Sequence, residues 1–260
     1  MKVIAVANQK GGVGKTTTSV NLSAALAAMD KRVLLVDMDP QGNATVSMGL
    51  NKAELDATAF ELLVDQQPLG EVAVPLPDLA MHCVPANGDL TAAEVALLSV
   101  GDREQRLKHA LKVASEAYDF VIIDCPPSLN MLTLNALVAA DSVLITMQCE
   151  YFALEGLSAL LETISTITAS VNPRLRVEGI LRTLYDPRNA LTNEVSEQLY
   201  QHFDGLVYRT VIPRNVKLAE APSHGVPGIV YDRLSRGSTA YMALAGEFMR
   251  RQEQQSREPQ

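Results

Sequence analysis

The chain has 260 residues, of which 47% are apolar, and its formal net charge is −8. This length and apolar content suit one large α/β domain or two small ones and exclude a largely disordered chain. The negative charge taken alone argues against nucleic-acid binding. However, the segment 174–236 carries nine Lys/Arg against seven Asp/Glu, which allows a local basic face.

No targeting or membrane-spanning segment is expected. Met1 and Lys2 lead directly into an apolar strand, without the regions that make up a signal peptide. No uninterrupted apolar stretch approaches the roughly 18 residues that a membrane span needs. Cys83, Cys125 and Cys149 are widely spaced and form no CxxC pair, so we expect buried free thiols in a reducing cytoplasm.

Segments typical of strands and of helices alternate along the chain, which predicts an α/β fold: one mostly parallel twisted sheet with helices on both faces. The expected strands are 2–7, 32–37, 81–85, 120–124, 142–146, 176–181 and 206–211. The first expected helix begins near Ser19, and further helices are expected over 102–116, 153–170 and 239–251. The stretch 51–79 is the least regular. No linker divides residues 1–250, so we expect a single domain, followed by a polar, disordered tail over 251–260.

A glycine-rich loop follows the first expected strand, with the sequence Gln9-Lys10-Gly11-Gly12-Val13-Gly14-Lys15-Thr16-Thr17. Strand, glycine loop, Lys-Thr and helix, in this order, bind nucleotide phosphates; a glycine-rich turn with incidental lysines is the alternative. Glycine lets backbone N–H groups face the phosphate, and the helix N-terminus adds its partial positive charge. We expect Lys15 to reach the β- and γ-phosphates and the Thr16 hydroxyl to hold Mg²⁺.

Two acidic segments at strand ends extend the expected site. Asp124 ends the strand 120–124, where a carboxylate points into the crevice in which open α/β sheets bind ligands. We expect it to order the hydration shell of Mg²⁺, with capping of the next helix as the alternative. Asp37 and Asp39 lie two residues apart at the end of strand 32–37, so they point to the same face and can position water and metal. A turn built on Asp-Pro and Gly-Asn is the alternative there.

The loop departs from the pattern G-x-x-x-x-G-K-[ST], because Gln9 occupies the first glycine position and an additional lysine, Lys10, follows it. This form resembles the deviant Walker A loop of the ParA/MinD group of P-loop ATPases. Further segments are similar to those of small Soj-like chromosomal ParA proteins, namely Asp37–Asn43, Gln148–Leu157, Val211–Asn215, Glu220–Gly225 and Tyr231-Asp232 with Ser235-Arg236-Gly237. The resemblance extends from residue 1 to about residue 249.

The resemblance implies an ATP-dependent homodimer that uses ATP and Mg²⁺ and has weak intrinsic ATPase activity. It implies that Lys10 crosses the dimer interface to the partner's nucleotide, that Asp39 orients the attacking water, and that residues 213–215 close over the adenine. The implied catalytic residues are Lys10, Lys15 and Asp39, and the implied metal-binding residues are Thr16, Asp39 and Asp124. The implied nucleotide-binding residues are Lys10, Gly11, Gly12, Val13, Gly14, Lys15, Thr16, Thr17, Pro213, Arg214 and Asn215.

The resemblance also implies non-specific binding of double-stranded DNA, a ParB-type partner that stimulates hydrolysis, and a cytoplasmic, nucleoid-associated location. Arg188 and Lys217 match positions that the family uses as basic DNA contacts, and Arg214 and Arg236 are further candidates. The alternative for each is a solvated surface cation. Lysine can replace arginine in a contact to a DNA phosphate. DNA binding through phosphate contacts weakens steeply as the salt concentration rises.

Other classes of function are distinguished by particular features. A ParA-like ATPase that positions another cargo differs only in its partner. A MinD-like membrane positioner would need a C-terminal amphipathic helix, but the segment after Met249 has no apolar stripe. An electron-transfer ATPase like the nitrogenase iron protein needs cluster-ligating thiolates, for which Cys125 is poorly placed. A plasmid-type ParA with an N-terminal DNA-reading domain is not expected, because the nucleotide strand begins at Lys2.

Overall fold

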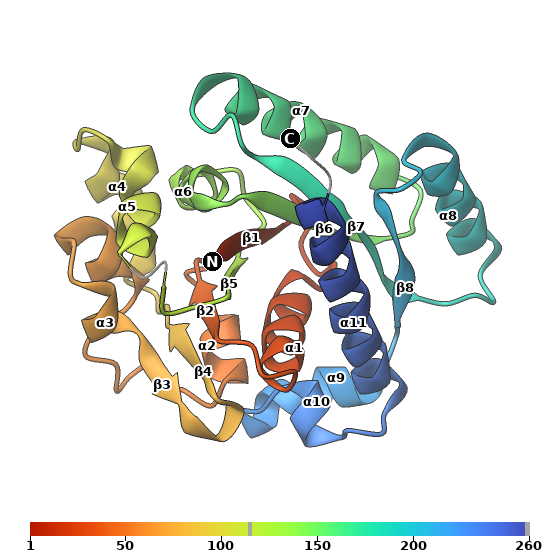
Figure 1. The fold of residues 1–260 in the computed structure, drawn as a ribbon, viewed down its shortest axis with the longest axis horizontal. Helices are drawn as coiled ribbons and strands as arrows, with labels where there is room; N and C mark the ends of the chain where they lie inside the picture. Colours follow the sequence, from red (N-terminus) through yellow and green to blue (C-terminus); the bar gives the residue numbers. More distant parts are fainter. Residues whose placement is uncertain (114–115, 258–260) are drawn as a thin grey trace.

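A computed structural model of the chain describes residues 1–113 and 116–257, and an eight-stranded sheet lies at its centre (Figure 1). The strands follow one another across the sheet in the order β3-β4-β2-β5-β1-β6-β7-β8. Their bounds are β1 Lys2–Ala7, β2 Val33–Asp37, β3 Val74–Leu76, β4 Met81–Val84, β5 Phe120–Asp124, β6 Ser142–Gln148, β7 Arg176–Tyr185 and β8 Val207–Pro213. Every neighbouring pair is parallel except β3 and β4, which confirms the predicted fold class.

Helices cover both faces of the sheet (Figure 1). On one face α1 (Lys15–Ala27) contacts α11 (Arg236–Arg257), and on the other α6 (Met131–Ala139) contacts α7 (Ala153–Ser170). The remaining helical segments are α2 Asn43–Ser47, η1 Glu61–Asp65, α3 Leu69–Val72, η2 Pro77–Leu79, α4 Leu90–Leu98, η3 Arg103–Gln105, α5 Arg106–Lys112, α8 Ala190–His202, α9 Val216–Glu220, η4 Ala221–His224 and α10 Gly228–Tyr231.

Each face of the sheet has its own apolar core, and the alternation of side chains along a strand feeds both. In β1, Val3 and Ala5 join the core that also contains residues of α6 and α7. Ile4 and Val6 of the same strand join the core that contains residues of α1 and α11. Because successive strand residues point to opposite faces, a central strand covered on both sides is apolar throughout. This explains why these strands are evident in the sequence.

The strand register brings the predicted acidic residues to the start of the glycine loop. Asp124 of β5 lies opposite Val6 of β1 and also opposite Asp37 of β2. The carboxyl ends of β2, β5 and β1 therefore meet at one edge of the sheet. In open parallel sheets the ligand crevice lies at this edge. It forms at the point where the connections from neighbouring strands lead to opposite sides of the sheet.

Several elements differ from those expected from the sequence. The first helix begins at Lys15 and not near Ser19, and β7 continues to Tyr185, beyond the expected end at residue 181. The expected helix over 102–116 is a short 3₁₀ turn followed by α5, which ends at Lys112; residues 114–115 lie outside the described residues. The helices α4, α6 and α8 have no counterpart among the expected elements.

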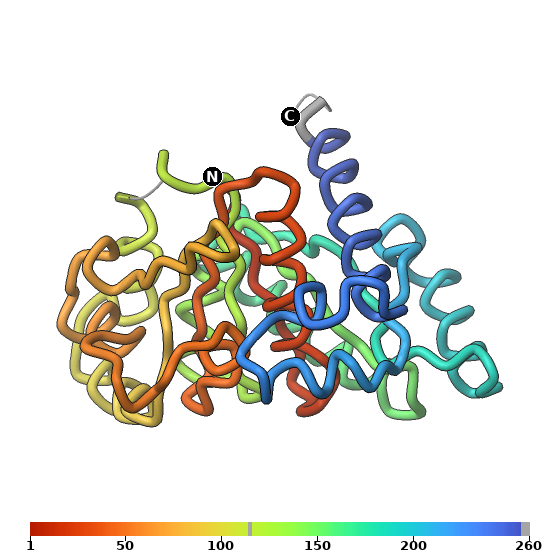
Figure 2. The backbone as a smooth tube through the Cα atoms, turned by 90° about the horizontal axis from the view of Figure 1, so that it is seen from below, coloured from red at the N-terminus to blue at the C-terminus, as the bar shows by residue number. Residues whose placement is uncertain are grey.

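The prediction of a disordered tail from residue 251 is wrong for residues 251–257, which continue α11. Arg251 donates to the Val207 carbonyl at 2.8 Å, and Gln252 donates to Glu178 at 2.6 Å. Polar residues at this end of the helix therefore form hydrogen bonds to neighbouring strands. Figure 2 shows this end of α11, in blue, on the same side of the molecule as the N terminus, and Lys2 donates to Gln255 at 3.1 Å. Residues 258–260 lie outside the described residues.

Within the ranges that the structure describes, the helices are too short or too polar to cross a bilayer.

Candidate nucleotide-binding site

The glycine loop joins β1 to α1 at the carboxyl edge of the sheet. Gly12 and Gly14 have φ angles of 75° and 81°, a left-handed conformation that glycine adopts without a steric penalty. Gly14 directly precedes α1, and no described side chain caps the first turn of this helix. The N–H groups at the start of α1 are therefore free to bind an anion.

Lys15 is the first residue of α1 and is only 6% exposed. Its Nζ donates to the Lys10 carbonyl at 3.1 Å. Burial lowers the pKa of Lys15, although the nearby Asp124 opposes this shift. Because an ammonium group has three donors and this one has a single acceptor among the described residues, phosphate oxygens would complete its hydrogen bonding.

Asp124 is fully buried at the end of β5. One of its oxygens accepts from the Ser19 hydroxyl at 2.9 Å, and the other has no partner among the described residues. Burial, aided by the charge of Asp37, raises the pKa of Asp124 well above its usual range. A cation in the crevice would satisfy the unpaired oxygen. Asp124 does not cap the following helix, since Asn130 accepts from the Thr133 N–H of α6.

Asp37 and Asp39 differ in their surroundings. Asp37 is fully buried and accepts both from the Thr45 N–H at 2.8 Å and from the Thr45 hydroxyl at 2.7 Å, so it anchors α2. Asp39 accepts from the Gln41 N–H at 2.9 Å through one oxygen, which is the Asp-Pro turn weighed from the sequence. Its second oxygen has no described partner and remains available at the rim of the crevice.

The donor set suits a magnesium ion that arrives with a nucleotide. Among the described residues, no three His, Cys, Asp or Glu side chains are arranged to hold a metal ion by themselves. Mg²⁺ normally takes one or two carboxylates together with phosphate oxygens and water. Thr16, Asp39 and Asp124, with the unpaired oxygen of Asp124, fit that requirement.

A cavity of about 100 Å³ lies beside the glycine loop. Its lining comprises Gly14, Thr17, Thr183, Leu184, Ile212, Pro213, Asn215, Leu218, Ala219 and Tyr241. Two of the residues expected to cover the adenine, Pro213 and Asn215, thus face the loop, whereas Arg214 is exposed and does not line this cavity.

Three polar residues of this region were missed by sequence reasoning. The Thr183 hydroxyl donates to the Val13 carbonyl of the glycine loop at 2.7 Å. Tyr241 of α11 lines the cavity and shares a hydrogen bond of 3.0 Å with Thr18 of α1. Thr183 could have been found from the rule that ligand groups follow the carboxyl ends of parallel strands, had the end of β7 been placed correctly. The sequence carries no comparable signal for Tyr241 or Thr18.

Lys10 lies apart from this buried group. Its Nζ forms an ion pair with Glu150, and about half of each side chain is exposed. Tyr151 and Phe152, which follow Glu150, are also exposed. The additional lysine of the loop, Lys10, is therefore on the surface of this copy of the chain, at the mouth of the site.

The four candidate DNA-contacting residues come from segments that neighbour one another. Arg188, after β7, donates to both oxygens of Asp186 at 2.9 and 2.8 Å. Arg214, after β8, lies close enough to Asp186 to help lower its pKa. Lys217 pairs with Glu220 at 2.9 Å, and Gly237, next to Arg236, packs against Leu218 and Asn215.

A parallel sheet, a glycine loop, a buried lysine that opens the next helix and a buried carboxylate at the end of an adjacent strand together define a P-loop nucleoside triphosphatase. A family model described as an AAA domain matches residues 1–177. The chain is 51% identical to sporulation initiation inhibitor protein Soj of Bacillus subtilis, covering 95% of this chain and 97% of that one. It is 49% identical to chromosome partitioning protein ParA of Myxococcus xanthus, covering 96% and 88%. The chain therefore belongs to the ParA/Soj family of partitioning ATPases, as the resemblance of its motifs predicted.

A solved structure shares the fold and indicates what the site holds in a relative. The structure described as cobyrinic acid a,c-diamide synthase from Mycobacterium smegmatis, with bound ADP and magnesium, is 39% identical with a TM-score of 0.86. The similarity covers 100% of this chain and 98% of that one. At the level of the family, the predicted ATPase class and the predicted pair of ATP and Mg²⁺ are confirmed.

Proposed function

We propose that this protein is a partitioning ATPase that converts ATP and water to ADP and phosphate and acts in the segregation of a chromosome or plasmid. The observation that carries the proposal is the buried pair of Lys15 and Asp124 beneath the glycine loop. Both groups lack full hydrogen bonding in the described chain, and Mg·ATP would provide it. Residues 1–250 would form the ATPase domain.

Each residue of the site has a distinct part in the proposed hydrolysis. Lys15 would neutralise charge on the β- and γ-phosphates, and Asp39, through its available oxygen, would orient the attacking water. Thr16, Asp39 and Asp124 would hold Mg²⁺, which supplies further charge neutralisation at the phosphates. The glycine loop from Lys10 to Thr17 would wrap the phosphates, with residues 213–215 over the adenine.

Lys10 supports the further proposal of an ATP-bound homodimer. Its surface position, paired with Glu150, leaves it accessible to a second copy of the chain. Cationic groups supplied in trans accelerate phosphoryl transfer by about 10³–10⁵ in other P-loop proteins. A ParB-type partner that completes this arrangement would raise an otherwise weak intrinsic turnover.

We also propose that the dimer binds double-stranded DNA without sequence preference, which would associate the protein with the nucleoid. Arg188 and Arg214 both act on Asp186, and the segments that carry Lys217 and Arg236 pack together, which supports a local basic face despite the negative net charge. Contacts to phosphates, unlike contacts to base edges, carry no sequence information.

The test is DNA binding by the purified protein with ATP, ADP or no nucleotide, each at two salt concentrations. We expect ATP-dependent, salt-sensitive binding to arbitrary DNA that Arg188→Glu abolishes. Arg174→Glu is the matched control, because Arg174 is exposed, carries the same charge and precedes the opposite end of β7. Absence of binding under every condition would instead favour a ParA-like positioner of another cargo.

A further inference from the structure

The edge strand β8 is irregular shortly before it reaches the nucleotide cavity. Ile180 of β7 pairs with Val207 and Arg182 pairs with Val211, so two steps along β7 match four steps along β8. Residues 208–210 therefore bulge out of the ladder. Their backbone N–H and carbonyl groups cannot all pair with β7 and need other partners.

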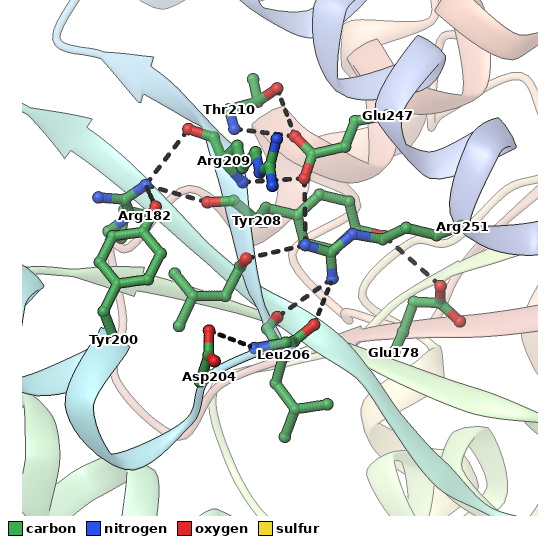
Figure 3. Close-up of polar contacts among 12 residues, drawn as sticks. Glu178, Arg182, Tyr200, Asp204, Leu206, Tyr208, Arg209, Thr210, Glu247 and Arg251 are labelled. Atoms are coloured by element: carbon green, nitrogen blue, oxygen red, sulfur yellow. Dashed lines mark hydrogen bonds and ion pairs between the residues drawn. The ribbon is translucent and has the colours of Figure 1, made fainter. Parts of the chain in front are cut away.

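Arg182 satisfies the carbonyl groups of this bulge (Figure 3). Its Nη2 donates to the Tyr208 carbonyl at 2.9 Å and to the Arg209 carbonyl at 3.3 Å. The guanidinium is held in place because it also donates to the Ser196 hydroxyl at 2.6 Å and to the Tyr200 hydroxyl at 2.7 Å. Arg182 is 5% exposed and forms no ion pair with a carboxylate of the described residues. The buried guanidinium is therefore compensated only by backbone carbonyls and hydroxyls. Burying a charge without a carboxylate partner costs folding free energy, which indicates that Arg182 has a specific role here.

Glu247 of α11 satisfies the amide groups of the same bulge from the other side (Figure 3). Its carboxylate accepts from the Arg209 N–H and the Thr210 N–H, each at 2.8 Å, and from the Thr210 hydroxyl at 2.7 Å. Burial raises the pKa of Glu247, but the bonds from Thr210 and Arg209 outweigh it, so the pKa is lowered on balance. Arg251, one turn further along α11, pairs with Glu247 at 3.1 Å and fixes its orientation.

The bulge helps to set where the last residues of β8 lie relative to β7 and the cavity. The bulge advances β8 by two residues relative to β7, so it leaves side chains on the same faces and changes how far along β7 they lie. In the observed register Val211 lies opposite Arg182. After a second shift, in which three steps along β7 match two along β8, Pro213 lies opposite Tyr185. This register places Ile212 and Pro213 in the lining of the cavity beside the glycine loop.

We infer that Arg182 and Glu247 are positioning residues for the nucleotide base: by clamping residues 208–210 they hold Pro213 and Asn215 at the cavity. The inference rests on the proposed function, in which residues 213–215 cover the adenine. Neither clamp residue contacts the glycine loop or Lys15 through a described hydrogen bond. The clamp should therefore affect recognition of the base and leave recognition of the phosphates unchanged.

The test compares ATP with a ligand that has phosphates and no base. Glu247→Gln keeps the size of the side chain but places an NH₂ group opposite one of the bulge amides. By isothermal titration calorimetry with Mg²⁺ we expect the Kd of ATP to rise about tenfold, as for the loss of a charge-assisted hydrogen bond. The Kd of inorganic tripolyphosphate should not change. Thr210→Val, which removes only the hydroxyl bond, should raise the Kd of ATP in the same direction by a smaller factor.

Two further variants sharpen the test. Arg182→Lys keeps the charge but cannot reach both carbonyls and both hydroxyls, so it should also raise the Kd of ATP selectively. Glu253→Gln, at an exposed position of α11, is the matched control and should bind ATP normally. Equal weakening of ATP and tripolyphosphate would overturn the inference, as would an unchanged Kd of ATP in a variant with a lowered melting temperature. If the unaltered protein binds no ATP, the proposed function itself fails.

Discussion

Arg188 and Lys217 each face a carboxylate that lies two or three residues away in the chain. Hydrogen bonds from Arg188 hold the pKa of Asp186 at about 2, so this carboxylate is ionised at neutral pH. Glu220 likewise has a lowered pKa because Lys217 donates to it. Each carboxylate competes with a DNA phosphate for the cation that it faces. The two carboxylates therefore weaken the proposed DNA binding and can be removed separately.

Asp186→Asn should tighten DNA binding in the ATP state. The change frees Arg188 from its counter-ion, and we expect an affinity gain of about two- to fivefold at low salt, the value of one exposed ion pair. The measurement is fluorescence anisotropy with a labelled duplex at several salt concentrations. Asp78→Asn, exposed at the far edge of the sheet, makes the same change in net charge and should have little effect. Equal gains in both variants would show that only overall charge matters.

Thr183 should hold the glycine loop in its binding conformation. Thr183→Val removes the buried bond to the Val13 carbonyl, and we expect the Kd of ATP to rise about three- to tenfold, since such a bond contributes about 0.5–1.5 kcal/mol. Thr183→Ser keeps the hydroxyl and should bind ATP almost normally. Calorimetric titration of the two variants provides the comparison. If valine binds ATP as well as serine does, the bond has no part in binding.

The strand β7 links features that the sequence presents as unrelated. Its last residues meet, in order, the β8 bulge through Arg182, the glycine loop through Thr183, and the cavity through Leu184. The loop that follows carries Arg188. Leu184 has a φ of 50°, a left-handed conformation that non-glycine residues seldom adopt, and it lies where the register between β7 and β8 shifts.

The parts of this molecule that could be predicted are those encoded by local pattern. Buried parallel strands are apolar throughout, and the glycine loop has a fixed spacing, so both were identified from sequence. The contact between Glu247 and Arg209 joins residues 38 positions apart, and the contact between Thr183 and Val13 joins residues 170 apart. No local pattern encodes such pairs. Sequence periodicity also could not show that polar residues after Met249 would be used by neighbouring strands.

Those polar residues make α11 a structural element to its end, and Arg251 tests this. Its guanidinium lies 3.9 Å from the centre of the Tyr208 ring and donates to the Val207 carbonyl. We expect Arg251→Ala to lower the free energy of unfolding by about 1.5–3 kcal/mol, as for hydrogen bonds to a charged group. Arg250→Ala, at the exposed neighbouring position, should change it little. Urea titrations of both variants measure these free energies of unfolding. Equal values for the two variants would mean that the contacts of Arg251 do not stabilise the protein.

Across the whole molecule, the carboxyl ends and the amino ends of the strands carry different groups. The glycine loop, Asp124, Arg188 and Arg214 lie at or just after carboxyl ends of strands. The opposite edge carries a buried network in which Glu178 accepts from Lys2 at 3.1 Å, from Ser142 at 2.7 Å and from Gln252. This network ties the start of the chain to its last helix. The predicted nucleotide-binding residues thus lie at the carboxyl ends of the strands, while the amino ends are held by hydrogen bonds to Glu178.

The buried acids of the nucleotide edge make the stability of the nucleotide-free protein depend on pH. Burial raises the pKa of Asp37, and burial together with Asp37 raises that of Asp124 to about 8. In the unfolded chain both carboxyl groups titrate near pH 4. Between these limits the folded state binds more protons than the unfolded state, so the free energy of unfolding falls as pH rises. Each group contributes a slope of at most about 1.4 kcal/mol per pH unit.

Urea unfolding at pH 6 and pH 8 measures this fall directly, and Asp124→Asn should reduce it because an amide does not titrate. Saturating Mg·ATP should also reduce it, since cationic charge beside Asp124 favours the ionised carboxylate that the empty crevice disfavours. The reduction would appear in the unaltered protein and be absent in Asp124→Asn. A free energy of unfolding that rises from pH 6 to pH 8 without nucleotide would mean that Asp124 is already ionised in the crevice. Burial and the charge of Asp37 would then not raise the pKa of Asp124, and the argument for a pH-dependent crevice would lose its physical basis.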